Sequence, residues 1–409
     1  MKQFWQWVKE HDALMIGSAL GLSITGILLI YSSHHSATGG YYQDFYLKQI
    51  IWLGMAFAAF YLAVTIPLRV HEVFAYVYLL VICGALLFLI MMGHQIAGAA
   101  RWIFLGPAYI QPSELAKIAV IISLARYLAY SKRAVLSVRT LLGVLALVGT
   151  TAALVLKQPD LGTSLVFWAV AVTMLFWAGA PPLTLFLILS PVLSLILAFH
   201  WISWIVFFIL VLVILHHHRP SLWAAGSVIV ANLAFGIITP IIWKGLLDYQ
   251  KKRILTFLDP GTDSMGAGYQ IIQSKVAIGS GGIFGKGFLQ GTQSRLDFLP
   301  ARHTDFIFSV AGEEFGLLGG LFIIGLFVLL MWRITTIGFV TRNRFNRFLA
   351  CGVLATIGFQ MLINIGMTTG LAPVTGLPLP LVSYGGSSLV VFWIMIGLVA
   401  NIHRHWQEY

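Results

Sequence analysis

The sequence has little charge. Of its 409 residues only 10% are Asp, Glu, Lys or Arg, while 59% are apolar, and the mean hydropathy is +0.90. The stretch 161–218 contains no Asp, Glu, Lys or Arg at all. A soluble chain of this length forms domains with polar exteriors, so the composition excludes a soluble globular protein. It predicts an all-α protein that crosses a membrane many times.

Cysteines, repeats and appended segments are also scarce. The two cysteines, Cys83 and Cys351, both lie inside apolar runs, which excludes a disulfide framework and a zinc site. The chain has no repeat of fixed period, no low-complexity tail and no appended soluble domain, so we expect one integral membrane domain over residues 1–409. The net charge of +11 reflects membrane loops, and we expect no nucleic-acid partner.

Apolar runs are abundant, and twelve of them are long enough to be candidate spans of a hydrocarbon core of about 30 Å. The run at 201–215 is short and is also compatible with half of a re-entrant pair. The runs lie at 13–31, 50–68, 73–92, 113–130, 140–156, 161–179, 183–199, 201–215, 221–243, 305–332, 348–369 and 386–402.

The distribution of Lys and Arg predicts the orientation. With the amino terminus inside, thirteen of these residues fall on the cytoplasmic side and only three in short outer loops. Cations that flank a span are retained on the cytoplasmic side, so both termini are predicted to be cytoplasmic. The long segment 244–304 is then an outer loop.

This long loop has an unusual composition. Residues 244–305 hold thirteen of the 39 charged residues and a cluster of six glycines between 279 and 291. Asp259 and Asp263 lie close together, and Lys286 and Arg302 follow. Carboxylates beside cations suit group transfer on a phosphate-bearing substrate, or a divalent cation such as magnesium or manganese on a pyrophosphate. A merely solvated loop is the alternative. The segment around Gly285 and Lys286 does not match a Walker loop.

Several charges lie inside or at the ends of predicted spans. Glu114 and Lys117 are three residues apart, so they share a helix face and can neutralise each other. Glu313 and Glu314 are adjacent, so only one of them is expected to face the protein interior. Asp160 either caps the helix that follows it or contacts a substrate.

The segment Gly370–Ser388 has three prolines and four glycines near the outer edge of the membrane. Such backbone cannot continue as a regular helix. Broken backbone at membrane depth persists only where protein or a watery cavity satisfies it, so we expect this segment to line the same outer cavity as the long loop.

Five separated motifs resemble the SEDS family of cell-wall polymerases. They are RWIFLGPAYIQPSELAK (101–117), KQPDLGTS (157–164), DPGTDSMGAGYQIIQSKVAIGSGG (259–282), FLPARHTDFIFSVAGEEFG (298–316) and NIGMTTGLAPVTGLPLPLVSYGGSS (364–388). The sequences around 291–308 and 364–370 are more similar to the RodA branch, which acts in elongation, than to the FtsW branch, which acts in division.

The resemblance implies a peptidoglycan glycosyltransferase that polymerises lipid II during cell elongation and cell-shape maintenance, with inversion at the donor anomeric carbon. It implies the bacterial cytoplasmic (inner) membrane, an outward-facing active site, and partnership with a class B penicillin-binding protein, a transpeptidase, and the elongation machinery. The acidic residue of the family's long loop corresponds to Asp263, the predicted catalytic residue, although Ser264 follows it where proline is common. Supporting or substrate-binding roles are expected for Arg101, Glu114, Lys117, Asp160, Lys286, Arg302 and Glu314.

The chain departs from the family in a second respect, the number of spans, and two rival functions are considered. Members of the family usually have ten spans, so 180–249 reads as an insertion that adds two helices. A lipid II flippase suits the spans and intramembrane charges equally well, but not the concentration of polar groups on one side. A non-catalytic scaffold for the penicillin-binding protein is the third interpretation.

Overall fold

The computed structural model describes residues 12–34, 45–92, 102–105, 108–131, 135–218, 220–245, 251, 256, 267–295, 298–299 and 301–404. These residues are almost entirely helical, which confirms the predicted all-α class. The one addition among them is a small antiparallel ribbon, in which β1 (Ile103–Leu105) pairs with β2 (Ala108–Ile110). The ribbon precedes α5, and its second strand leads directly into that helix.

Twelve described helices contain 16 residues or more, and each overlaps one of the twelve apolar runs. Nine of the described helices are long and apolar enough to cross a membrane, α7 and α8 are shorter apolar helices, and α5 carries the charged residues Glu114 and Lys117. The bounds are α2 (Ala13–His34), α3 (Phe45–Thr65), α4 (Leu68–Met92), α5 (Pro112–Tyr130), α6 (Val138–Leu156), α7 (Leu161–Trp177), α8 (Pro182–Leu197), α9 (Trp201–His218), α10 (Leu222–Gly245), α14 (Ile307–Val340), α15 (Arg344–Thr369) and α16 (Gly386–Arg404). Two further helices, α12 (Ala267–Ser280) and α13 (Thr292–Arg295), belong to the long loop.

Helix ends follow from local capping chemistry. Asp160 accepts a hydrogen bond from the backbone N–H of Thr163 at the start of α7, and Asn343 accepts two at the start of α15. Such caps each stabilise a helix by about 1 kcal/mol. At the other end of α15, Gly370 adopts a left-handed conformation with φ of 79°, which releases the chain into the broken segment 370–385.

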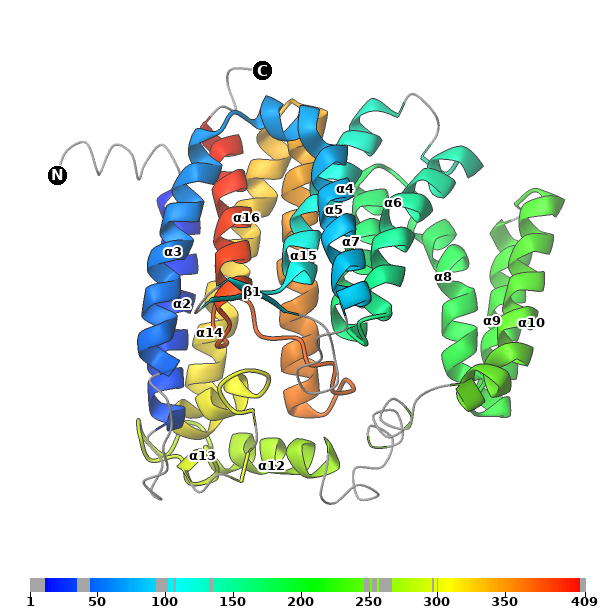
Figure 1. Cartoon of the computed structure of the whole chain (residues 1–409). Helices are drawn as coiled ribbons and strands as arrows, with labels where there is room; N and C mark the ends of the chain where they lie inside the picture. The colour runs from blue at the N-terminus through cyan, green and yellow to red at the C-terminus, as the bar shows by residue number, and fades with distance from the viewer. Residues whose placement is uncertain are drawn as a thin grey trace.

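The core of the bundle surrounds α15 and α16, the two most buried of the candidate spans. Helix α16 packs along α3, α14 along α2, and α15 against α5, α7 and α14 (Figure 1). Trp393 of α16 is fully buried against Phe57 and Phe60, and its Nε1 donates to Ser23 Oγ. A buried indole with its N–H satisfied fixes the register between α16, α3 and α2.

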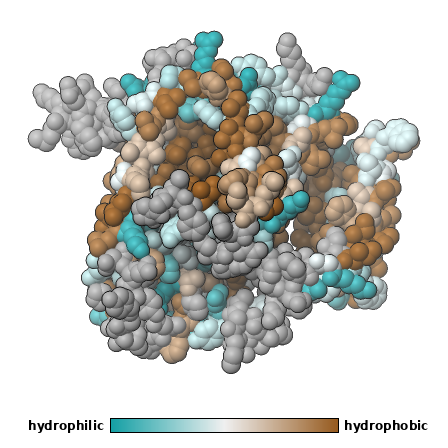
Figure 2. All heavy atoms as spheres, in the orientation of Figure 1, coloured by the Kyte–Doolittle hydropathy of each residue, from teal (hydrophilic) through white to brown (hydrophobic). Residues whose placement is uncertain are grey.

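The outer faces of the helices are apolar. Figure 2 shows hydrophobic residues over the sides of the visible helices and hydrophilic residues gathered mainly toward the ends. Leu80 and Val81 of α4, for example, are 74% and 60% exposed in the isolated chain. Side chains of this kind are stable only in contact with lipid, so the surface agrees with a protein that crosses a membrane many times.

Helix α14 is interrupted near its amino-terminal end, at Gly316. There the loop 281–287 supplies the missing backbone partners. The N–H groups of Lys286 and Gly287 donate to the carbonyls of Glu313 and Glu314, and the N–H groups of Leu317 and Leu318 donate to the carbonyls of Gly282 and Ile283. The break therefore leaves none of these backbone groups unsatisfied in the membrane.

Helices α8, α9 and α10 form a separate three-helix group beside the bundle (Figure 1). Its interior contains a buried polar cluster: Ser194 Oγ donates to Asn232 Oδ1 at 2.6 Å, and Asn232 Nδ2 donates to Ser190 Oγ at 2.8 Å. Among the described elements, α7 is the main contact of this group with the bundle. The group lies within the segment that we expected to be inserted.

Candidate functional site

A polar cavity of about 330 Å³ lies between the first turns of α5, α7 and α16, the broken segment before α16 and the turn 301–306 before α14. The described residues that line it are Trp102, Gln111, Glu114, Pro159, Asp160, Leu161, Thr163, Thr304, Asp305, Thr375, Gly376, Leu377, Pro378, Tyr384, Gly385, Gly386, Ser387 and Ser388. The prediction that the broken segment lines a cavity is therefore confirmed.

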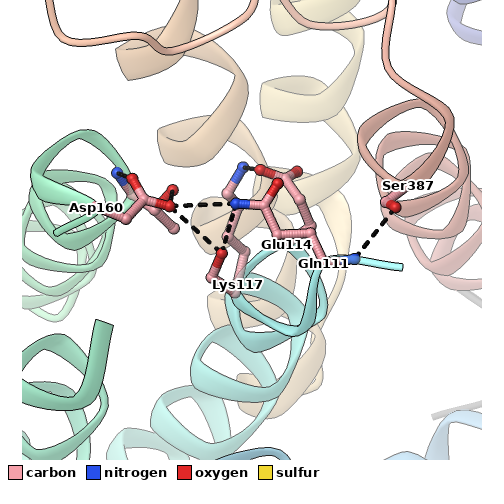
Figure 3. Close-up of polar contacts among 7 residues, drawn as sticks. Gln111, Glu114, Lys117, Asp160 and Ser387 are labelled. Atoms are coloured by element: carbon pink, nitrogen blue, oxygen red, sulfur yellow. Dashed lines mark hydrogen bonds and ion pairs between the residues drawn. The ribbon is translucent and has the colours of Figure 1, made fainter. Parts of the chain in front are cut away.

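Gln111 connects three sides of this cavity. Its Nε2 donates to Asp160 Oδ2 at 3.2 Å, and its backbone N–H donates to Ser387 Oγ at 3.3 Å. Figure 3 shows Gln111 between Asp160 of the α7 side and Ser387 of α16. Asp160 also caps α7 through Thr163, so it is both a helix cap and a cavity residue. The two alternatives that the sequence left open for Asp160 are thus compatible.

The predicted pairing of Glu114 with Lys117 is confirmed. Lys117 Nζ donates to Glu114 Oε1 at 2.6 Å and lies 5.6 Å from the centre of the Phe392 ring. Both side chains are buried, and the second oxygen of Glu114, Oε2, has no hydrogen-bond partner. Glu114 also borders the cavity, so the buried ion pair lies directly beside it.

The wall opposite α5 is built from two segments that are distant in sequence. Tyr384 donates its N–H to the carbonyl of His303, and Ser383 Oγ donates to the carbonyl of Thr304. The Tyr384 ring meets the rings of Phe45 and His303, and its burial raises the pKa of the phenol. These contacts hold the broken segment against the turn 301–306.

An apolar groove of about 300 Å³ lies beside the cavity, between α4, α5 and α16. Leu115 and Ile118 of α5 line the groove, while Glu114 of the same helix lines the cavity. The first turn of α5 therefore borders a polar space on one side and an apolar space open to the lipid side on the other.

The expectation that only one of Glu313 and Glu314 faces the interior is wrong, because both are buried. Glu313 Oε1 accepts hydrogen bonds from Lys286 Nζ at 2.8 Å and from the backbone N–H groups of Thr292 and Gln293. Glu314 accepts a hydrogen bond from Ser32 of α2. The folded loop covers the helix face that would otherwise be exposed, so the two side chains point to different neighbours within the protein.

The chain matches the model of the family described as "cell cycle protein", which comprises FtsW, RodA and SpoVE, in two parts that cover residues 12–204 and 202–408. The chain belongs to the FtsW/RodA/SpoVE family. The resemblance predicted from the motifs is thus confirmed, since SEDS is another name for these proteins.

Curated relatives of the FtsW/RodA/SpoVE family match over nearly the whole chain. The peptidoglycan glycosyltransferase MrdB of Escherichia coli K12 is 38% identical over 99% of this chain and 96% of its own. The peptidoglycan glycosyltransferase RodA of Treponema pallidum is 35% identical over 97% and 98%. A probable peptidoglycan glycosyltransferase FtsW of Geobacter metallireducens is 35% identical over 97% and 95%.

Solved structures of the family share the fold. A chain of a peptidoglycan synthase complex that coordinates polymerization and crosslinking superposes with a TM-score of 0.72, at 29% identity over 97% of this chain and 99% of that one. The rod shape-determining protein RodA of Thermus thermophilus gives 0.63 at 25% identity, over 96% of both chains. The RodA branch is thus represented among both the curated relatives and the solved structures.

The structure brings only some of the expected site residues of this family member together. Glu114 and Asp160 both line the cavity, Lys117 pairs with Glu114, and Arg302 is buried in the turn that leads to Asp305. Lys286 and Glu314 lie instead at the break in α14. Arg101, Asp259 and Asp263 lie outside the described residues.

Sequence reasoning missed two cavity residues, Gln111 and Asp305, and the buried Asn364 that donates to the carbonyl of Asp305. All three lie inside the motifs that carry the family resemblance, and this position was the signal that could have identified them. Among the described residues, no group of three or more His, Cys, Asp or Glu side chains could hold a metal ion.

Proposed function

We propose that the chain is a peptidoglycan glycosyltransferase that polymerises lipid II into glycan strands during elongation and cell-shape maintenance. The observation that supports this most is the polar cavity at the first turn of α5, which lies beside an apolar groove. Relatives of the same family are named peptidoglycan glycosyltransferases. A substrate with a sugar head and a polyprenyl tail needs both kinds of space, side by side.

The reaction is a displacement at a sugar carbon. The 4-hydroxyl of the acceptor's N-acetylglucosamine attacks the anomeric carbon of the donor's N-acetylmuramic acid, the bond from that carbon to the pyrophosphate oxygen breaks, and the lipid pyrophosphate leaves. Asp263 accepts the hydroxyl proton as general base. Attack from the face opposite the leaving group converts an α-linked donor into a β-linked product.

The described residues divide between the head and the tail of this substrate. Glu114 and Asp160 present carboxylate oxygens to the sugars, and the groove of Leu115 and Ile118 holds the polyprenyl chain. Among the cations that we expected at the pyrophosphate, Lys117 and Lys286 are each held by a carboxylate. Arg302 is buried three residues before the cavity residue Asp305, and this position makes it a candidate for stabilising the leaving group.

The same proposal sets the topology and the partners. We place the chain in the bacterial cytoplasmic membrane with both termini inside, and the loop 244–304 outside as the catalytic loop. Residues 180–249, which include α8, α9 and α10, are proposed to hold the two added helices. The partner is a class B penicillin-binding protein that crosslinks the glycan, and the chain that superposes from a synthase complex supports this pairing.

The deciding experiment is polymerisation of labelled lipid II by the purified protein, with and without its cognate penicillin-binding protein. We expect glycan ladders from the wild type and a loss of about 10²–10⁴-fold from Asp263→Ala, because removal of a general base typically has this effect. Asp259→Ala is the matched control, since it removes a nearby carboxylate of the same loop.

Two outcomes would redirect the proposal. Wild-type rates from Asp263→Ala would reject that residue as the base. Absence of ladders with the partner and magnesium or manganese present would favour a lipid II flippase, if labelled lipid crosses vesicles containing the protein, or otherwise a non-catalytic scaffold. Assays with a chelator, followed by return of each metal, measure the cation requirement directly.

A further inference from the structure

Asp305 lines the cavity, and its carboxylate has no role in the function proposed so far. It lies in the turn 301–306 and lines the cavity together with Glu114 and Asp160, which come from other elements. Its Oδ2 lies 3.7 Å from the position that a Cβ atom on Gly376 would occupy. The carboxylate of Asp305 therefore lies close to the broken segment, at Gly376.

The backbone around Asp305 is fixed by three hydrogen bonds. Three successive carbonyls accept hydrogen bonds: His303 from the N–H of Tyr384 at 2.8 Å, Thr304 from Ser383 Oγ at 2.6 Å, and Asp305 from Asn364 Nδ2 at 2.9 Å. A backbone fixed at three consecutive residues fixes the direction of the side chain that it carries.

Asn364 is the central residue of this arrangement. Its side chain is fully buried in α15, and the same Nδ2 that donates to Asp305 also donates to the carbonyl of Leu377 at 2.8 Å. Asp305 and Leu377 both line the cavity. One amide group therefore joins the two chain segments that form this wall.

We propose that Asp305 is a further substrate-contacting residue, which accepts a hydrogen bond from a hydroxyl or amide N–H of the amino sugar, and that Asn364 is the residue that positions it. The inference rests on the proposed function, because it assigns a role within the same cavity. A carboxylate offers about four acceptor positions, so Asp305 can bind a sugar in addition to its contacts within the protein. In a partly enclosed cavity such a charge-assisted hydrogen bond is stronger than in water.

The first test is the kinetics of Asp305 variants on lipid II. Loss of a hydrogen bond to a charged group predicts a fall in kcat/KM of about ten- to a hundredfold for Asp305→Ala, with a smaller loss for Asp305→Asn, which keeps one acceptor oxygen. Affinity for labelled lipid II should fall as well, and this readout does not require turnover. Unchanged kcat/KM and affinity would overturn the assignment, as would a loss that added magnesium or manganese reverses, since that would indicate a metal ligand.

The second test compares two buried asparagines. Asn401 of α16 resembles Asn364 closely: its Nδ2 donates to the carbonyls of Ala63 and Ile66 at 2.9 and 2.7 Å, and its side chain is buried. It joins α16 to the end of α3, and is not among the described residues that line the cavity. Asn364→Ala and Asn401→Ala should therefore lower the melting temperature by similar amounts, whereas only Asn364→Ala should lower kcat/KM beyond that of its control.

A double variant separates positioning from general stability. If Asn364 acts through Asp305, then Asn364→Ala should lower kcat/KM and affinity little further in an Asp305→Ala background. The corresponding effects of Asn401→Ala should be the same in both backgrounds. Equal losses from both asparagine variants, or full additivity of Asn364→Ala with Asp305→Ala, would reject the positioning role.

Failure of this inference can be told from failure of the proposed function. An inactive Asp263→Ala beside a fully active Asp305→Ala would remove the role of Asp305 and leave the glycosyltransferase intact. A wild-type protein that binds lipid II without polymerising it would reject the function, while the binding measurements on Asp305→Ala would still decide whether that carboxylate contacts the sugar.

Discussion

Lys117 shows how strongly the surroundings of one side chain determine what it can do. It is among the largest fully buried side chains of the described chain, and its charge is balanced by Glu114 one helical turn away. A buried ammonium without a partner is highly unfavourable, so loss of either side chain leaves an unpaired buried charge that destabilises the protein. Because Glu114 also lines the cavity, the pair links the stability of α5 to the shape of the site.

The effects of substituting Glu114 and Lys117 on stability should therefore be strongly non-additive. Glu114→Gln leaves the Lys117 ammonium buried and unpaired, and Lys117→Met leaves the Glu114 carboxylate in the same condition. Each should destabilise the protein by about 3–5 kcal/mol, whereas the double variant should be nearly as stable as wild type. Thermal unfolding in detergent, monitored by tryptophan fluorescence, measures all three variants.

The double variant is the internal control for this prediction. It removes the same two groups but leaves no unpaired charge. If its melting temperature fell by the sum of the two single shifts, the pair would contribute through independent contacts instead of mutual neutralisation.

Helix α14 depends on a neighbouring loop. The loop 281–287 satisfies backbone groups at its break, and the close approach leaves no room for a Cβ atom at Gly281 and Gly285. At Gly285, where φ is +81°, a Cβ atom would collide with the carbonyl of Glu314. Two of the glycines that marked this loop as a possible site, Gly281 and Gly285, are therefore explained by packing against α14.

Two glycine substitutions should consequently have opposite effects. Gly285→Ala places a Cβ atom on a left-handed backbone and pushes the loop away from α14. It should destabilise the fold by about 1–3 kcal/mol or more. Gly279→Ala lies on α12 with nothing within 4 Å of its added Cβ, and should stabilise slightly, by about 0.5–1 kcal/mol. Melting temperatures and the rate of proteolysis of the long loop report both changes, and a stable Gly285→Ala would contradict the role given to the loop.

The helices could be predicted from the sequence because the membrane imposes a simple rule on each of them: a long apolar run with charges only at its ends. The Glu114–Lys117 pair followed from helical spacing, and the open backbone at 370–388 followed from its prolines and glycines. The orientation of Glu313 and Glu314 did not follow, because a loop that folds back over α14 is a tertiary contact with no local signal. The role of Asn364 in joining Asp305 to Leu377 was hidden for the same reason.

At the scale of the whole molecule, the polar elements lie at two ends of an apolar bundle. Helices α12 and α13 lie at one end, and the last turn of α16 lies at the other (Figure 1). The group α8–α10 stands beside this bundle and has a polar cluster of its own around Asn232. If all three of its helices cross the membrane, the end of α9 is cytoplasmic and the long loop is outside, as the distribution of Lys and Arg requires.

This arrangement predicts the labelling of two engineered cysteines. In a background with Cys83→Ala and Cys351→Ala, Ser280→Cys at the end of α12 and His217→Cys at the end of α9 both place a thiol at an exposed position. A membrane-impermeant maleimide added to intact spheroplasts should label Ser280→Cys. It should label His217→Cys only after the membrane is permeabilised, because in the predicted topology an even number of crossings separates the end of α9 from an amino terminus on the cytoplasmic side. The reverse pattern would invert the topology, and labelling of both thiols from outside would show that α8 and α9 do not each cross the membrane.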